Sequence, residues 1–252
     1  MKVLIVGNGI VGGNMRKLFP EADIHDPPQG IEADPSKLYD VAFICVPTPC
    51  KGAGECDTSI VEQAISQVNA RIYCIRSTVP PGTCRELALI TEKHIVFMPE
   101  YYGHSHHAND CDYGFITLAG EKEDTSIVAN LYERIFTGRL RIFQTTFETA
   151  ELCKYMENCF LGLKVTFCNE FYRIAQKLGV NYDELRELFI ADPRIGRSHT
   201  FVYIDQPYYE SKCLDKDIPA LIEFSKAIGA PAKLMQAVKE TNDNFKAESL
   251  KR

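Results

Sequence analysis

The sequence predicts an α/β protein with a doubly wound parallel sheet, followed by a smaller all-α domain built on a long central helix. Three observations carry this prediction. A glycine-rich turn directly follows an apolar strand near the N-terminus. Short apolar runs alternate with amphipathic stretches through the first half of the chain. After about residue 145 the pattern becomes purely helical. With 252 residues, of which 45% are hydrophobic, the chain can bury a sizeable core.

The predicted strands are short apolar runs at residues 2–6, 23–25, 41–46, 71–75, 94–98 and 115–119. Each is bounded by turn residues and followed by an amphipathic stretch. This alternation is typical of βαβ units, so we expect the strands to lie parallel in one sheet.

The helical half begins with an uninterrupted pattern over residues 145–178. Its apolar residues cover more than one face: Leu152, Tyr155, Met156, Cys159, Phe160, Leu163 and Phe167. Such a helix must be buried against neighbours or a second subunit, which predicts a homodimer. Shorter helices are expected at 182–189, 218–228 and about 231–245, with an irregular stretch at 192–212. The predicted domains are therefore residues 1–145 and 146–252.

Composition restricts the class of partner. A net charge of -6 and a sequence pI of about 5.6 give no general attraction for nucleic acid or anionic membranes, so a small-molecule substrate is expected. The N-terminal apolar run is too short for a signal peptide or membrane span, which predicts a cytoplasmic protein. Most of the ten cysteines stand singly in apolar runs, which favours buried, reduced thiols.

The glycine-rich turn is Gly7-x-Gly9-x-x-Gly12, between a predicted strand and a predicted helix. In this context it is typical of a Rossmann-type domain, where a dinucleotide pyrophosphate lies on the helix N-terminus. Asp26 stands about 20 residues later, where a carboxylate binds ribose, and no arginine adjoins it, which favours NAD over NADP. The cofactor contacts are expected from Gly7, Gly9, Ile10, Val11, Gly12 and Asp26. The alternative is a ligand-free turn with Asp26 as an ordinary strand-end residue.

Two further loops follow predicted strands, at Val46-Pro47-Thr48 and Ser77-Thr78. Ligands of open parallel sheets bind beyond the carboxyl ends of the strands, so both loops are expected to contact the cofactor. The alternative is that the prolines merely end the strands. No metal site is expected, because the group His104, His106, His107 and Cys111 lacks paired-ligand spacing.

A longer ordered set of motifs resembles one known family. After the glycine turn come Val46-Pro47-Thr48-Pro49, Ser77-Thr78-Val79-Pro80-Pro81-Gly82-Thr83, Pro99-Glu100, Glu151-Leu152-Cys153-Lys154 with Asn158, Lys164 and Asn169-Glu170, Asp192-Pro193-Arg194-Ile195-Gly196 and Cys213-Leu214-Asp215-Lys216-Asp217. This succession, over residues 1 to about 230, resembles the UDP-glucose/GDP-mannose 6-dehydrogenases. The resemblance implies oxidation of a primary alcohol at C6 of a sugar nucleotide to a carboxylate, with two NAD and a cysteine-bound thiohemiacetal and thioester.

The resemblance also implies roles for individual residues. Cys213 would be the nucleophile, and Asp217 would be a base or water-orienting carboxylate. Lys154 and Asn158, four apart on the long helix, would stabilise developing oxyanion charge and contact substrate. Further roles fall to Glu100 in acid–base or water-positioning work and substrate binding, to Thr78 in orienting water or nicotinamide, and to Arg194 on the substrate side. A purely structural role is the alternative for Cys213, Lys154, Asn158, Thr78 and Arg194.

The chain departs from the family in three places. His104 stands where the family has a second glutamate, and bulky residues 205–212 replace a glycine-rich segment before the nucleophile. The family continues into a third, nucleotide-binding domain, which we expect this chain to lack. Two other functions therefore stay open: a two-electron β-hydroxyacid-type dehydrogenase, which would not need Cys213, and a catalytically degenerate NAD-binding protein.

Overall fold

The computed structural model describes residues 1–101 and 114–251. The chain divides into two compact units, Met1–Lys51 with Cys56–Lys154, and Gly52–Glu55 with Tyr155–Arg252. The predicted domain boundary at residue 145 stays a prediction.

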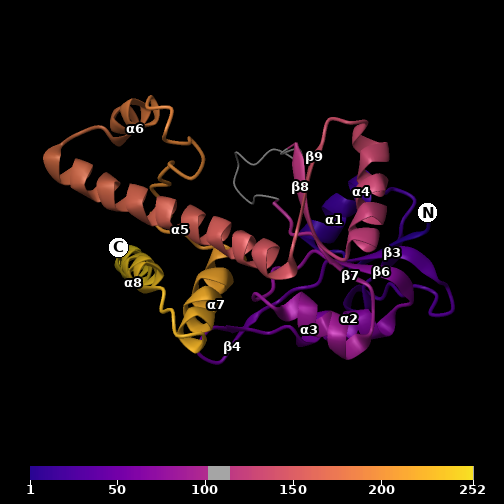
Figure 1. Ribbon diagram of the computed structural model, residues 1–252. Coiled ribbons are helices and arrows are strands. Elements are labelled where there is room, and N and C mark those ends of the chain that lie inside the picture. Colours follow the sequence, from indigo (N-terminus) through magenta and orange to yellow (C-terminus); the bar gives the residue numbers. More distant parts are fainter. Residues whose placement is uncertain (102–113, 252) are drawn as a thin grey trace. The chain divides into compact units, whose positions relative to one another are not determined.

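The first unit is built on a seven-stranded sheet with the order β2-β1-β3-β6-β7-β8-β9 (Figure 1). All six predicted strands are present. The strands are β1 (Val3–Val6), β2 (Asp23–His25), β3 (Tyr39–Ile44), β6 (Ala70–Ile75), β7 (Ile95–Phe97), β8 (Phe115–Gly120) and β9 (Arg141–Thr145). Strand β1 pairs in parallel with β2 on one side and with β3 on the other. The order of strands in the sheet therefore extends from β1 to both sides. This is the doubly wound order that the sequence predicts.

One pairing differs from the predicted parallel sheet. Strand β8 runs antiparallel to β7, with Phe97 opposite Ala119, while β9 is parallel to β8. Antiparallel strands at one side of an otherwise parallel sheet are common. The apolar pattern of residues 115–119 predicts a strand but not its direction, because a strand can bury the same apolar residues in either direction.

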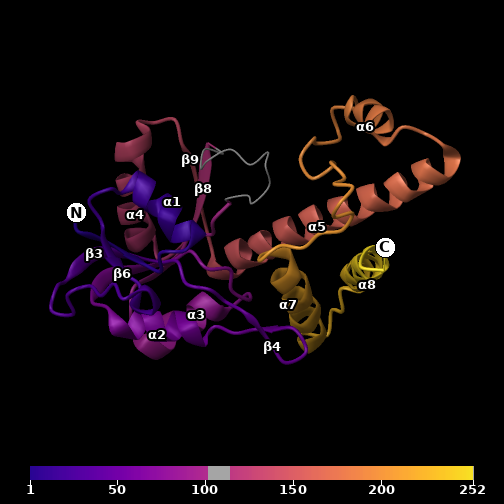
Figure 2. The same cartoon turned by 180° about the vertical axis from the view of Figure 1, so that it is seen from behind.

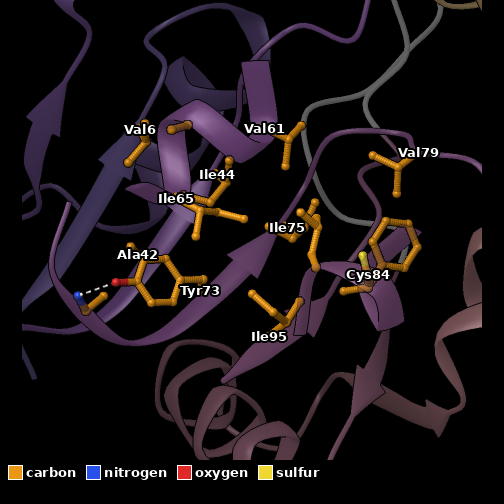
Figure 3. Close-up of a cluster of buried hydrophobic side chains, with 14 of the residues drawn as sticks. Val6, Ala42, Ile44, Val61, Ile65, Tyr73, Ile75, Val79, Cys84 and Ile95 are labelled. Carbon is orange, nitrogen blue, oxygen red and sulfur yellow. Dashed lines mark hydrogen bonds between the residues drawn. The ribbon is translucent and has the colours of Figure 1, made fainter. Parts of the chain in front are cut away.

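Helices cover both faces of this sheet. On one face lie α1 (Ile10–Leu18) and α4 (Lys122–Phe136), and on the other α2 (Ser59–Gln67) and α3 (Thr83–Thr91) (Figure 1). Side chains alternate between the two cores along each strand, so Ile5 and Phe43 pack under the first pair and Val6 and Ile44 under the second. Figure 3 shows the second core, where Ile65 of α2 lies beside Ile44, and Cys84 of α3 lies nearer to Ile75 of β6. Each large side chain buried in this way stabilises the fold by roughly 1.5–3 kcal/mol.

The strands that the sequence analysis missed are β9 and a small hairpin. The hairpin consists of β4 (Cys50–Lys51) and β5 (Glu55–Cys56), joined through Gly52 and Gly54, both at positive φ. Strand β9 carries exposed polar residues, so its apolar signal is weak. Two-residue strands are too short to produce a periodic pattern.

The second unit is helical, as predicted. It contains most of α5 (Phe147–Leu178), with α6 (Tyr182–Ile190), α7 (Leu214–Ala227) and α8 (Lys233–Ser249). Helices α7 and α8 pack against one side of α5 through a small apolar core, and α6 lies on the other side (Figure 2). Helix α7 begins at Leu214, four residues before the predicted residue 218, and the hydroxyl of Ser211 accepts the backbone N–H of Leu214 at this start.

The face of α5 that packs on this core is not its whole apolar surface. Tyr155 and Cys159 are buried, whereas Met156, Phe160 and Phe167 are exposed by 72%, 57% and 41%. Within one chain α5 therefore buries only part of its apolar surface, and its burial against a second subunit stays a prediction. Of the described helices, none is long and apolar enough to cross a membrane.

Candidate active site

The glycine turn has the backbone geometry that the motif requires. Gly7 has φ +90°, and a Cβ there would lie 2.7 Å from the carbonyl oxygen of Cys45. A Cβ on Gly12 would lie 1.9 Å from the carbonyl oxygen of Gly7. A Cβ on Gly9, the residue before α1, would meet nothing within 4 Å. The first and third glycines are thus needed by the protein itself, and the second keeps open space at the helix N-terminus.

Asp26 lies directly against this turn. It follows β2, is buried, and its carboxylate accepts a hydrogen bond of 2.6 Å from the backbone N–H of Asn8. Ile10 is exposed at the first position of α1, and Val11 is half-buried beside it. The turn, the helix N-terminus and a carboxylate after β2 together fit a dinucleotide, with the ribose hydroxyls facing Asp26.

The two strand-end loops meet at the carboxyl edge of the sheet. The Thr48 hydroxyl donates to the carbonyl of Thr78 at 2.8 Å, and the Ser77 hydroxyl donates to the carbonyl of Val46 at 2.6 Å. Thr48, Ser77 and Thr78 are buried, while Pro47 is exposed. The structure therefore brings these predicted residues together, and their hydroxyls fix one loop against the other.

Glu100 and Lys154 are the remaining predicted site residues of the first unit. Both are buried, and the ammonium of Lys154 lies 4.9 Å from the ring centre of Tyr101, the residue after Glu100. Burial raises the pKa of Cys45 to about 12, with opposing contributions from Arg76 and Glu100. The buried guanidinium of Arg76 and the buried carboxylate of Glu100 therefore both lie near Cys45, the residue after β3.

In the second unit, two predicted residues, Asn158 and Asp217, meet near the start of α7. The amide of Asn158 on α5 donates to the carboxylate of Asp217 at 2.6 Å, and both side chains are buried. The ammonium of Lys216 lies 2.5 Å from the other carboxylate oxygen of Asp217. A carboxylate held by an amide and an ammonium stays oriented as a hydrogen-bond acceptor.

Cys213 is the residue immediately before α7, so it lies one helical turn before Asp217. The backbone N–H of Asp217 donates to the Cys213 carbonyl at 2.9 Å, and the cysteine is half-buried. A helix N-terminus stabilises negative charge on a group placed there. The prediction of a thiolate nucleophile is compatible with this position.

Other predictions are placed elsewhere or lie outside the described residues. Arg194 is exposed and forms an ion pair with Asp192, and no described contact joins it to Asn158, Asp217 or Cys213. The segment that holds the four residues considered for zinc is not among the described residues: His104, His106, His107 and Cys111.

Sequence reasoning gave Glu151 no role, although the residue belongs to a quoted motif. Its carboxylate is fully buried and accepts the N–H groups of Gly82 and Cys84 at 2.6 and 2.8 Å. These are the first N–H groups of α3, so Glu151 caps α3 from α5, three residues before Lys154. The available signal in the sequence was a glutamate within a quoted motif of the long, mostly apolar helix.

Comparison with known proteins fits this geometry. Residues 30–137 match the NAD binding domain of the UDP-glucose/GDP-mannose dehydrogenase family, and residues 148–244 match the central domain of the same family. The chain belongs to this family. The match to its NAD binding domain confirms the prediction of NAD as the cofactor. This match begins at residue 30, after the glycine turn, so the assignment of the turn itself depends on the geometry described above.

Individual members of the family are also similar to this chain in sequence. A UDP-glucose 6-dehydrogenase of Rickettsia prowazekii is 30% identical over 216 residues, which are 81% of this chain and 49% of that protein. A UDP-N-acetyl-D-mannosamine dehydrogenase of Methanocaldococcus jannaschii is 29% identical over 238 residues, 88% of this chain and 53% of that protein. The chain thus spans about half the length of these relatives.

A solved family structure shares the fold. The UDP-glucose dehydrogenase of Pyrobaculum islandicum superimposes with a TM-score of 0.80 and 22% identity, covering 96% of this chain and 68% of that one. The Rossmann-like sheet followed by a helical region on a long helix, as predicted, is confirmed.

Proposed function

We propose that this chain is an NAD-dependent nucleotide-sugar dehydrogenase that oxidises a primary alcohol at C6 of a sugar nucleotide, such as UDP-glucose, to the carboxylate. The observation that carries the proposal is the buried Asn158–Asp217 pair at the start of α7, one turn after Cys213. A nucleophile, an oriented carboxylate and an amide donor are the groups that thioester formation and hydrolysis require.

NAD would be held by the glycine turn and Asp26, with the Thr48 and Ser77–Thr78 loops at its nicotinamide end. When bound, NAD accepts the hydride removed from carbon in each of the two oxidations. The protein's share is to orient the carbon, hold the developing charge and move protons.

Cys213 carries the covalent step. Its thiolate attacks the aldehyde carbon produced by the first oxidation and gives a thiohemiacetal, which the second oxidation converts to a thioester. Water then adds to the thioester carbonyl, its proton passes to Asp217, and the carbon–sulfur bond breaks to release the carboxylate and regenerate the thiolate. Asn158 and Lys154 stabilise the oxyanions that form in these steps.

Three residues have supporting roles in this scheme. Glu100 positions water or transfers protons and contacts the substrate. Thr78 orients water or nicotinamide. Arg194 acts on the substrate side, and its exposure allows it to meet an anionic group that a neighbouring chain or ligand brings to it.

We further propose that the protein acts in the cytoplasm as a homodimer. The exposed apolar face of α5 supports the dimer, because it continues through Phe171, Ile174 and Leu178. Two such faces packed together would remove these side chains from water.

The test is NADH formation at 340 nm with UDP-glucose, GDP-mannose and UDP-N-acetylmannosamine, comparing the unchanged chain with Cys213→Ala. Cys153→Ala is the matched control, since Cys153 is an exposed cysteine elsewhere. We expect two NADH per substrate, loss of turnover in Cys213→Ala, and normal turnover in the control.

The outcomes separate the open functions. Full activity of a Cys213→Ser variant would select a two-electron dehydrogenase of the β-hydroxyacid type. NAD binding without turnover on any sugar nucleotide would select a non-catalytic NAD-binding protein or a site completed by another chain.

A further inference from the structure

The hairpin between the Thr48 loop and α2 carries two cysteines on opposite strands. The backbone N–H of Asp57 donates to the carbonyl of Pro49 at 2.8 Å, so these two residues face each other. One step further into the hairpin, Cys50 of β4 therefore faces Cys56 of β5.

This register brings the two thiols within bonding reach. Because Pro49 and Asp57 form the hydrogen-bonded pair, Cys50 and Cys56 form a non-hydrogen-bonded pair. The Cα atoms of such a pair lie about 4.5 Å apart, with both side chains on one face. Disulfides span Cα separations of about 4.4–6.8 Å. Both cysteines are reduced in the structure.

The exposure of Cys50 distinguishes this pair from the other neighbouring thiols. Cys50 is exposed, Cys56 and Cys45 are half-buried, and Cys74 is buried. Cys45 and Cys74 also lie close to each other, but neither is exposed, and desolvation raises the pKa of each to about 12, which suppresses the thiolate. An oxidant in solution can reach Cys50 and cannot easily react with the Cys45–Cys74 pair.

The hairpin is in contact with the predicted cofactor loops. The Sγ of Cys56 lies 3.9 Å from the carbonyl oxygen of Thr78, the same oxygen that accepts the Thr48 hydroxyl. A thiol can donate to that oxygen, whereas a disulfide sulfur has no proton to donate. Oxidation of Cys56 therefore changes the support of the Thr78 backbone.

We propose that Cys50 and Cys56 are a reversible oxidation site that takes a low-molecular-weight disulfide such as oxidised glutathione. The Cys50 thiolate attacks one glutathione sulfur and releases one glutathione thiol. The Cys56 thiolate then attacks Cys50 and displaces the second glutathione. Two protein thiols are oxidised to one disulfide, one glutathione disulfide is reduced to two thiols, and the two protons end on these thiols.

A second consequence rests on the proposed NAD site. The oxidised chain, which lacks the Cys56 donor to Thr78, binds NAD about two- to tenfold more weakly, as expected for the loss of one hydrogen bond that supports the loop.

The experiment equilibrates the full chain in glutathione buffers of graded oxidised-to-reduced ratio, blocks remaining thiols by alkylation, and maps the peptides by mass spectrometry. The variants are Cys50→Ser, which leaves Cys56 in place, and Cys153→Ser, which removes an exposed cysteine on α5. We expect an intramolecular 50–56 disulfide in the unchanged chain and in Cys153→Ser. Cys50→Ser should form none, and glutathione should restore the thiols.

The NAD dissociation constant is then measured for the reduced and oxidised forms of each protein. Weaker binding on oxidation should occur in the unchanged chain and be absent in Cys50→Ser. Failure to find the 50–56 link at any ratio, or its formation in amounts no greater than other cysteine pairings, overturns the proposal. If the reduced chain does not bind NAD, the proposed function fails, and the disulfide map still decides the oxidation site.

Discussion

At the scale of single residues, the three glycines of the turn have separate physical roles. Gly12 is required by the fold, since a Cβ there would overlap the carbonyl of Gly7. Gly9 is surrounded by open space, which the fold alone does not require. Because Gly9 directly precedes α1, this open space lies at a helix N-terminus, where a pyrophosphate can approach the backbone N–H groups.

We therefore predict that Gly9→Ala folds normally and binds NAD at least tenfold more weakly, because the added methyl group occupies the space that the pyrophosphate would approach. The matched control is Gly13→Ala, four residues later on α1, where a Cβ also meets nothing within 4 Å. Isothermal titration with NAD measures both. Equal affinity of the two variants would contradict the placement of the pyrophosphate.

His199 gives a pH dependence to the stability of the second unit. Burial lowers its pKa, with a smaller contribution from Lys164, and its Nδ1 is buried without a hydrogen-bond partner among the described residues. The unfolded chain therefore binds more protons than the folded chain just below the ordinary histidine pKa of about 6.5. The stabilisation is complete above that pH and is lost as pH falls through the lowered pKa.

We expect the urea midpoint of the unchanged chain to fall between pH 7.5 and 5.5, and to fall less in His199→Asn, since asparagine tolerates the φ of +60° at this position. Equal losses in the two proteins would show that His199 does not cause the effect.

At the scale of elements, α3 and α5 are joined by a buried carboxylate rather than by apolar packing alone. Glu151 accepts two N–H groups of α3, although burial raises its pKa and so disfavours the charged form. The neighbouring pair Arg85–Glu148 joins the same helices at the surface.

We predict that Glu151→Ala lowers the free energy of unfolding by about 1–3 kcal/mol, because it leaves two buried N–H groups without an acceptor. Glu148→Ala, which breaks the exposed pair, should cost less than about 1 kcal/mol. Denaturant unfolding followed by circular dichroism measures both. A larger loss in Glu148→Ala would place the main connection at the surface.

At the scale of the whole molecule, one face of α5 presents apolar side chains that no described helix or strand of the same chain covers. Phe167 contacts Phe171 and Phe189, with ring centres 4.7 and 6.2 Å apart, so the exposed aromatic surface extends onto α6. Apolar surface of this kind is typical of a subunit interface.

We predict that Phe167→Glu converts a dimer to a monomer in sedimentation equilibrium, because two buried carboxylates would face each other across a symmetric interface. Leu89→Glu, at a residue of α3 that is 74% exposed, is the control and should leave the dimer intact. A monomeric unchanged chain would refute the proposed interface.

The sequence by itself determined six of the seven strands of the main sheet, the long helix and the glycine turn, because periodic burial and φ above zero leave local signals in residue type. It also ordered the motifs that resemble the family, and the matched domains agree with them. It did not determine the direction of β8, the exposed face of α5, the Glu151 cap or the facing of Cys50 and Cys56. These depend on contacts between residues far apart in the chain, or on strands too short for a period. Only the tertiary structure decides which polar group a buried carboxylate meets.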